Sequence, residues 1–160
     1  MALNKTILLV EDEESDIFFL KLAFKVAGIL NPLQVVQDGD EALDYLSGAG
    51  KYADREQFPL PCLTLLDLKL PHMMGLEVLK WIREQPCFKT LIVIVLTSSR
   101  HKSDIETAYQ LGANAYLVKP STPRELREIA RRIKLFWLEL NQGPEVCKDA
   151  QVSLDPCFKD

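Results

Sequence analysis

The sequence contains few histidines and few cysteines, and none of its cysteines are closely spaced in pairs. The 160 residues include only two histidines and four cysteines, at His72, His101, Cys62, Cys87, Cys147 and Cys157. The cysteines form no C-x-x-C pair and have no histidines at metal-ligand spacing. The sequence therefore argues against a zinc site and predicts no disulfide framework.

Positive charge and long apolar runs are also lacking. Against 19 Lys and Arg stand 23 Asp and Glu, which leaves a formal net charge of −4. A general nucleic-acid binder needs a basic surface to displace counterions, so direct binding to nucleic acid is not expected. No apolar run reaches the roughly 18 residues of a membrane span, and no signal peptide pattern opens the chain. We expect a cytoplasmic protein without a membrane partner.

What the sequence does contain is a regular alternation of short apolar runs and longer segments of helical period. With 48% hydrophobic residues, its length suits one domain. The apolar runs predict strands at 6–10, 33–37, 62–66, 91–96 and 115–118. The helical patterns follow them at 15–27, 40–46, 76–82, 105–111 and 123–140. This alternation is typical of a doubly wound α/β fold with five βα units and a parallel sheet.

Gly28 and Gly112 are placed to end two of these helices, and Pro123 to begin the last one. From Asn141 onward the chain is polar and irregular. We therefore expect one folded domain at 1–140 and a flexible tail at 141–160, which is too short for an effector domain.

Chemically active side chains follow the predicted strands. Ligands of open parallel sheets sit beyond the carboxyl ends of the strands, so these positions are the first to inspect. They are occupied by Glu11, Asp12, Asp67, Thr97 and Lys119. Five acids and no base stand within the segment 11–16 alone. The sequence therefore predicts carboxylates, a hydroxyl and an ammonium group at one edge of the sheet.

Neighbouring carboxylates repel one another unless a cation neutralises them. A hard, oxygen-binding ion suits this set, and we predict Mg²⁺, held directly by Asp12, with Glu11 acting through a water. Such a pocket suits phosphoryl transfer, with Asp67 as the nucleophile that forms an aspartyl-phosphate. Thr97 and Lys119 would then hold the phosphoryl oxygens.

These motifs together resemble the receiver domain of two-component response regulators. The resemblance extends from about Lys5 to Leu140 and rests on spaced motifs at four of the five predicted strands. The matching residues are Val10-Glu11-Asp12, Leu66-Asp67 with Pro71 and Gly75, Leu96-Thr97-Ser98, and Tyr116 with Lys119-Pro120.

The resemblance implies a flavodoxin-like fold of strand order 2-1-3-4-5 and a histidine kinase that phosphorylates Asp67. It also implies Mg²⁺ at Asp12, Asp67 and the backbone carbonyl of Lys69, and a cis Lys119–Pro120 bond. Such a protein is no conventional enzyme, although it catalyses its own phosphorylation and slow dephosphorylation.

Three details are similar to single-domain regulators that partner bacterial phytochrome-type kinases. They are the loop 51–61, the run 67–71 and Phe136-Trp137-Leu138 in the last helix. With no effector domain, the output must come through a changed protein-binding surface. We expect Thr97 and Tyr116 to couple as the switch.

Two apolar groups bear on the partners. Phe18, Phe19 and Leu22 broaden the first predicted helix beyond one buried stripe, which indicates either a kinase-docking face or extra core contact. Phe136 and Trp137 indicate either a homodimer contact or packing against the tail.

Two other functions compete with this interpretation. A hydrolase of the haloacid dehalogenase type also forms an aspartyl-phosphate. Its motif resembles Asp-x-Asp, in which the second aspartate acts as general acid and base, whereas the position two beyond Asp67 is Lys69. A flavodoxin would need a phosphate-binding loop after the first strand, where the acidic segment 11–16 repels phosphate instead.

Overall fold

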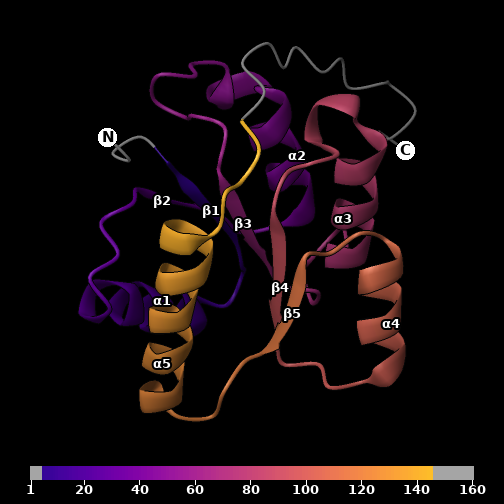
Figure 1. Ribbon diagram of the computed structural model, residues 1–160. Coiled ribbons are helices and arrows are strands. Elements are labelled where there is room, and N and C mark those ends of the chain that lie inside the picture. Colours follow the sequence, from indigo (N-terminus) through magenta and orange to yellow (C-terminus); the bar gives the residue numbers. More distant parts are fainter. Residues whose placement is uncertain (1–4, 146–160) are drawn as a thin grey trace.

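The computed structural model describes residues 5–145 and contains one five-stranded parallel sheet. The strands are β1 (Ile7–Val10), β2 (Leu33–Val36), β3 (Leu63–Leu66), β4 (Val93–Thr97) and β5 (Ala115–Val118). Their order across the sheet is β2-β1-β3-β4-β5 (Figure 1). This confirms the predicted flavodoxin-like topology and places β1 beside β3, with Val10 opposite Leu66.

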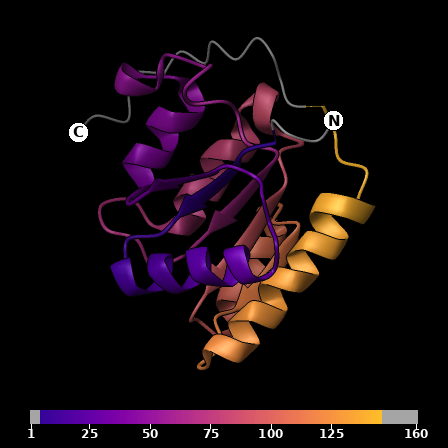
Figure 2. The ribbon, with the colours of Figure 1, turned by 90° about the vertical axis from the view of Figure 1, so that its left-hand side faces the viewer.

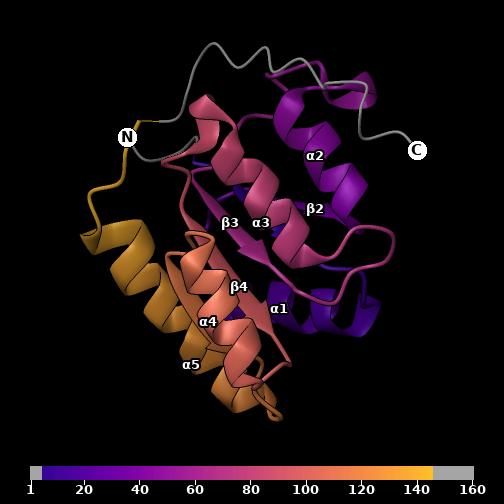
Figure 3. The ribbon, with the colours of Figure 1, turned by 90° about the vertical axis from the view of Figure 1, so that its right-hand side faces the viewer.

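Helices cover both faces of the sheet. They are α1 (Glu14–Val26), α2 (Gly39–Ser47), α3 (Gly75–Glu84), α4 (Lys102–Gln110) and α5 (Pro123–Ile133). Helices α1 and α5 pack on one face (Figure 2), and α2, α3 and α4 lie on the other (Figure 3). Each face has its own apolar core, and every residue of β1, β3 and β4 is buried. Strands covered on both sides need apolar side chains pointing both ways, which explains why β1 is wholly apolar and β3 and β4 each contain a single threonine as their only polar residue.

The predicted helix boundaries are confirmed where a specific residue sets them. Gly28 and Gly112 follow α1 and α4 with φ of 73° and 97°, a region that glycine enters without steric cost. At the start of α5, the side chain of Thr122 accepts a hydrogen bond from the Glu125 amide, and Pro123 occupies the first helical turn. These signals are local, so the sequence alone reveals them.

The last helix departs from the prediction. Its regular α-helical part ends at Ile133, and residues Lys134–Leu140 form a π-helix, in which hydrogen bonds span one residue more. At its end the Asn141 amide donates to the Phe136 carbonyl, at 2.6 Å. Residues 141–145 have no regular secondary structure, as expected. The rest of the predicted tail, 146–160, lies outside the described residues.

Two further expectations are wrong. Cys87 is disulfide-bonded, whereas Cys62 is free; sequence spacing alone does not show which thiols meet in space. The Lys119–Pro120 bond is trans, because residues 5–145 contain no cis peptide bond, and trans remains the lower-energy isomer even before proline.

Among the described residues, no helix combines the length and apolar character that a membrane crossing requires.

The segment between α2 and β3 is an ordered loop. It begins with a short 3-10 helix, Gly50–Tyr52. The rings of Tyr52 and Phe58 in the loop cluster with the ring of Tyr45 in α2, with centroids 5.0 to 6.1 Å apart. Arg55 donates hydrogen bonds to the carbonyl oxygens of Tyr45 and Leu46, both at 2.7 Å. The loop is therefore anchored to the end of α2.

Candidate functional site

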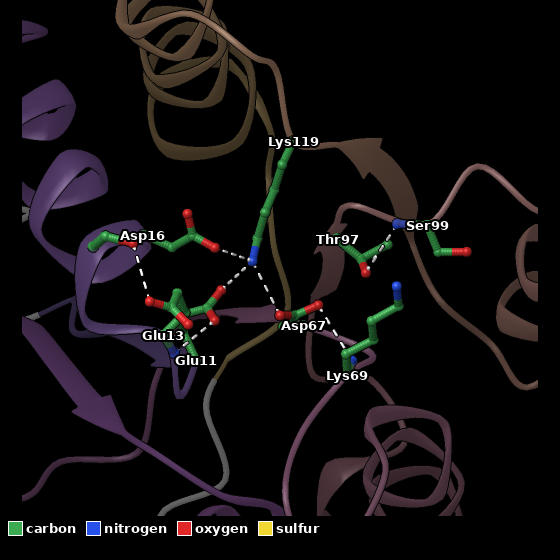
Figure 4. A network of polar contacts seen from close by, with 9 residues as sticks. Glu11, Glu13, Asp16, Asp67, Lys69, Thr97, Ser99 and Lys119 are labelled. Carbon is green, nitrogen blue, oxygen red and sulfur yellow. Dashed lines mark hydrogen bonds and ion pairs between the residues drawn. The ribbon is translucent and has the colours of Figure 1, made fainter.

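The predicted site residues meet at the carboxyl edge of the sheet (Figure 4). Glu11 and Asp12 directly follow β1, Asp67 follows β3, Thr97 ends β4 and Lys119 follows β5. Since β1 pairs with β3, the carboxylates that follow these two strands become neighbours. The strand order thus assembles groups that are up to 108 residues apart in the chain.

Three carboxylates lie close enough to share one cation. Oxygen atoms of Glu11, Asp12 and Asp67 all lie within 4.8 Å of one another. Glu11 and Asp67 are buried, whereas Asp12 is exposed. The donors are all oxygens, as a hard divalent ion such as Mg²⁺ requires, and the exposed member leaves room for water ligands. The donor set therefore fits a divalent metal ion.

Lys119 contacts three carboxylates at once. Its Nζ lies 2.5 Å from Glu11 Oε2, 2.8 Å from Asp16 Oδ2 and 3.0 Å from Asp67 Oδ2. Burial alone would lower the pKa of Lys119, but the hydrogen bonds to Asp16 and Glu11 and the charge of Asp67 raise it well above its usual value. Lys119 therefore stays protonated and offsets part of the negative charge of the site.

Glu11 is the most deeply buried carboxylate of the site. Its burial raises its pKa to about 7, although the hydrogen bond from Lys119 works in the opposite direction. Its Oε1 accepts a hydrogen bond from the Glu13 amide, at 3.1 Å, and its Oε2 accepts from Lys119. Both oxygens already have protein partners, which suits a supporting position beside the metal site.

Asp67 is held between two donors. Its Oδ2 accepts from Lys119, and its Oδ1 accepts from the Lys69 amide, at 3.3 Å. Leu68 and Leu70 are buried and anchor the loop, while Lys69 between them is exposed. Thr97 and Lys69 lie on the opposite side of Asp67 from Glu11 and Asp16 (Figure 4). Asp67 thus stands at the centre of the site.

Thr97 and Tyr116 are connected through Ser99. The buried Thr97 hydroxyl accepts a hydrogen bond from the Ser99 amide, at 3.4 Å, and the Tyr116 hydroxyl donates to the Ser99 carbonyl, at 3.0 Å. The Ser99 hydroxyl in turn donates to Asp104 in the first turn of α4, at 2.5 Å. The structure therefore links both predicted switch residues to the start of the β4–α4 loop.

Sequence reasoning assigned no role to two residues of this site, Asp16 and Ser99. Asp16 belongs to the acidic segment 11–16, and its position in the first turn after a strand end is the signal that could have singled it out. Ser99 follows Thr97 closely, but it contacts Tyr116 through its own backbone carbonyl, which no side-chain motif reveals. By contrast, Glu11, Asp12, Asp67 and Lys119 meet as expected.

Comparisons with known proteins agree with this geometry. The family described as the response regulator receiver domain matches residues 7–131. The response regulator Rcp1 of Synechocystis is 38% identical over 135 residues, which cover 84% of this chain and 90% of Rcp1.

Two solved structures are similar over nearly the whole chain. The phosphorylated cyanobacterial phytochrome response regulator RcpA has a TM-score of 0.82 at 37% identity and covers 89% of this chain, with 99% of RcpA matched. The Mn²⁺-bound form of Rcp1 has a TM-score of 0.80 at 38% identity, with coverage of 88% and 99%. The similarity to phytochrome response regulators confirms the narrower resemblance drawn from the sequence.

Proposed function

The chain belongs to the response regulator receiver domain family of two-component signalling, and on this premise we propose that Asp67 accepts a phosphoryl group from a sensor histidine kinase. The observation that carries the proposal is the position of Asp67: its two carboxylate oxygens face Lys119 and the Lys69 amide, with further carboxylates of the site beside it. A carboxylate so placed can attack phosphorus while neighbouring groups offset the charge.

In the proposed transfer, an oxygen of Asp67 attacks the phosphorus of a phosphohistidine. The new O–P bond forms as the P–N bond breaks, and the electron pair of that bond stays with the imidazole nitrogen. Lys119 and the Thr97 hydroxyl donate hydrogen bonds to the phosphoryl oxygens. A divalent ion bound at the site would offset the remaining charge on those oxygens.

We propose Mg²⁺ as that ion. Asp12, Asp67 and the backbone carbonyl of Lys69 would hold it directly, with Glu11 acting through a water. The all-oxygen donor set supports this assignment, and so does the Mn²⁺-bound form of the relative Rcp1.

The phosphoryl group is proposed to persist as a signal. A hydrolase of the dehalogenase type would need an acid–base aspartate two positions beyond Asp67, where this chain has the exposed Lys69. A flavodoxin would need a phosphate-binding loop after β1, where Glu11 and Asp12 stand. Neither alternative is favoured.

The signal is proposed to pass through Thr97 and Tyr116. A hydrogen bond from Thr97 to the phosphoryl group would draw the end of β4 towards Asp67. The Ser99 carbonyl, which accepts from Tyr116, would move with it and change the surface beside α4. We propose that a protein partner reads this surface and that no nucleic acid is bound directly.

For the input, we propose a phytochrome-type kinase that docks on α1. The side chains of Phe18, Phe19 and Leu22 are 62%, 43% and 45% exposed, which leaves an apolar surface beside the site. We propose that the receiver domain comprises residues 1–140, followed by a tail at 141–160, and that it acts as a stand-alone regulator.

Intact-mass measurement tests the proposed phosphorylation. After incubation with a small acyl-phosphate donor and Mg²⁺, the protein is expected to gain the mass of one phosphoryl group. The Asp67→Asn variant should gain none, and chelation of the metal should slow the reaction of the wild type. A wild type that never gains this mass, or an Asp67→Asn variant that gains it equally, would disprove the proposal.

A further inference from the structure

The disulfide of Cys87 joins the folded domain to the end of the chain. Residues 5–145 contain one other cysteine, Cys62, and its thiol is free, whereas Cys87 is disulfide-bonded. The partner of Cys87 is therefore one of the two cysteines that follow residue 145, which are Cys147 and Cys157.

Cys87 lies on a well-anchored turn after α3. It is the middle residue of a short 3-10 helix, Pro86–Phe88. The buried Phe88 ring packs on Trp81 of α3, at 6.0 Å between centroids, and the Phe88 carbonyl accepts a hydrogen bond from Arg83, at 3.1 Å. Cys87 itself is only half-buried. The turn thus holds the sulfur in place while leaving the residue partly accessible to small reagents.

The chain returns to this turn after the π-helix. A β-carbon at Gly143 would lie 3.3 Å from Cδ1 of Ile92, the residue that precedes β4. Pro144 and Glu145 line the same small cavity as Cys87. The chain therefore already lies beside the turn of Cys87 where the described residues end.

The length of chain that remains favours Cys147 as the partner. Cys147 stands two positions beyond Glu145, and two extended residues span at most about 7 Å. A disulfide needs Cα atoms about 4.4–6.8 Å apart, which this short link keeps within reach. Cys157 follows ten positions later, and the longer link loses more entropy when its ends are brought together.

We propose that Cys87 and Cys147 form a reversible, redox-sensitive disulfide, which tethers the chain after the π-helix to the amino-terminal edge of the sheet. Disulfides that are accessible to solvent are the labile and regulatory ones, and those that form where glutathione keeps thiols reduced are usually redox sensors. The inference does not rest on the proposed function, because Asp67 lies at the opposite, carboxyl-terminal edge.

Closure of the tether needs an oxidant, for which we propose a small disulfide such as oxidised glutathione. The Cys87 thiolate attacks one sulfur of the reagent, which forms a mixed disulfide and releases one glutathione thiolate. The Cys147 thiolate then attacks the Cys87 sulfur and releases the second glutathione thiolate. The two thiols of the chain give up two electrons and two protons, the reagent takes up the electrons, and the released thiolates and the solvent take up the protons.

Cys62 lines the same cavity but is not expected to compete. Burial raises the pKa of the Cys62 thiol, and the thiolate, not the thiol, is the nucleophile in disulfide exchange. Cys62 should therefore keep its thiol while Cys87 and Cys147 react.

Peptide mapping of the full chain tests the pairing. The reduced protein is treated with oxidised glutathione without denaturant, its remaining thiols are alkylated, and it is digested with trypsin without reduction. Trypsin cleaves at Lys148, so Cys147 and Cys157 fall in separate peptides, 135–148 and 149–159. We expect the intact protein to lose two hydrogen atoms and peptide 84–89, which contains Cys87, to be linked to 135–148. A link to 149–159 or to the peptide of Cys62, or no link at all, would overturn the inference.

The matched variants are Cys147→Ser and Cys157→Ser. Cys147→Ser should fail to close the tether and should keep one glutathione on Cys87. Cys157→Ser removes a thiol from the same part of the chain and should close the tether as the wild type does. Closure by Cys147→Ser, or its failure in Cys157→Ser, would show that the pairing is wrong.

Reversibility and location are tested on the oxidised wild type. An excess of reduced glutathione should restore both thiols, and a bond that stays closed would contradict a redox-sensitive role. Oxidised and reduced protein should gain a phosphoryl group from an acyl phosphate at the same rate, because the tether lies away from Asp67. A slower gain in the oxidised form would overturn this placement. No gain in either form would contradict the proposed function and leave the tether standing.

Discussion

Gly75 packs directly against the backbone of Asp67. A β-carbon at Gly75 would lie 2.1 Å from the Asp67 carbonyl oxygen and 2.7 Å from the Leu68 Cα. The Gly75 amide also donates to the Leu68 carbonyl, at 3.0 Å. The first residue of α3 thus supports the backbone of the proposed phosphoacceptor, and only glycine leaves the required space.

Replacing Gly75 by alanine should therefore disturb Asp67. Overpacking against backbone atoms costs about 1–3 kcal/mol, and we expect Gly75→Ala to lose that much unfolding free energy. The rate of phosphorylation by an acyl phosphate should also fall, because Asp67 must shift. Urea unfolding and intact-mass kinetics measure the two effects. Gly143→Ala, which meets only the side-chain atoms of Ile92 and Asn141, serves as control, and an unchanged Gly75→Ala rate would contradict the prediction.

The start of α3 lacks a good capping side chain. Met74 is the N-cap residue and is 49% exposed, and its thioether is a poor acceptor for the free amides of the first turn. Glu77 already accepts from the Met74 amide, at 2.8 Å. We expect Met74→Ser to raise the unfolding free energy by about 0.5–2 kcal/mol in urea unfolding. Met73→Ser, one residue outside the cap, should not stabilise the protein, and an equal gain there would argue against capping as the cause.

Arg55 anchors the loop between α2 and β3. Its guanidinium donates to the carbonyl oxygens of Tyr45, Leu46 and Phe58. Removing it takes a donor away from each of these three acceptors, so Arg55→Ala should cost about 2 kcal/mol in urea unfolding and expose the loop to proteolysis. Lys51→Ala removes an ion pair whose lysine is 70% exposed and should cost much less unfolding free energy than Arg55→Ala. Similar losses in both variants would refute the anchoring role.

The raised pKa of Glu11 makes stability depend on pH. Its pKa is about 7 in the fold, against an ordinary value of 4.5, so the folded state binds this proton more tightly than the unfolded state does. The resulting stabilisation is complete below pH 4.5 and is lost as the pH rises through 7. The raised pKa of Lys119 acts only above its usual value of 10.5, outside this window.

We therefore expect the metal-free protein to lose on the order of 2 kcal/mol of unfolding free energy between about pH 5 and pH 8. Glu11→Gln should flatten this dependence, and saturating Mg²⁺ should oppose the loss at high pH. Urea titrations at several pH values measure the slope. If Glu11→Gln keeps the wild-type slope, the slope does not come from Glu11.

The π-helix Lys134–Leu140 offers a candidate homodimer contact. The Phe136 and Trp137 rings meet edge to face at 4.9 Å between centroids, and Phe136 is 51% exposed while Trp137 is half-buried. We expect sedimentation to detect a dimer in at least one of two conditions, with or without phosphorylation. Phe136→Ser should weaken this dimer. The control is Val26→Ser, which also removes exposed apolar surface, but from α1 and not from the π-helix. A monomer under both conditions would rule out the dimer.

The sequence by itself determined the fold class and most of the site. Buried parallel strands need unbroken apolar runs, and the chemistry of such sheets gathers at strand ends, so Asp12, Asp67, Thr97 and Lys119 could be read directly from their positions. Helix ends set by Gly28, Gly112 and Pro123 were equally readable, because capping depends on neighbouring residues only.

Tertiary structure decided the contacts between distant residues. Asp16 and Lys119 are separated by 103 positions, and their ion pair exists because the Lys119 side chain, just beyond β5, reaches the first turn of α1. Tyr116 meets a backbone carbonyl of Ser99, and Gly75 meets the backbone of Asp67, and neither partner leaves a side-chain pattern in the sequence. Local signals state which groups are present at the sheet edge, but hydrogen bonds and close contacts depend on distances that only the packed chain sets.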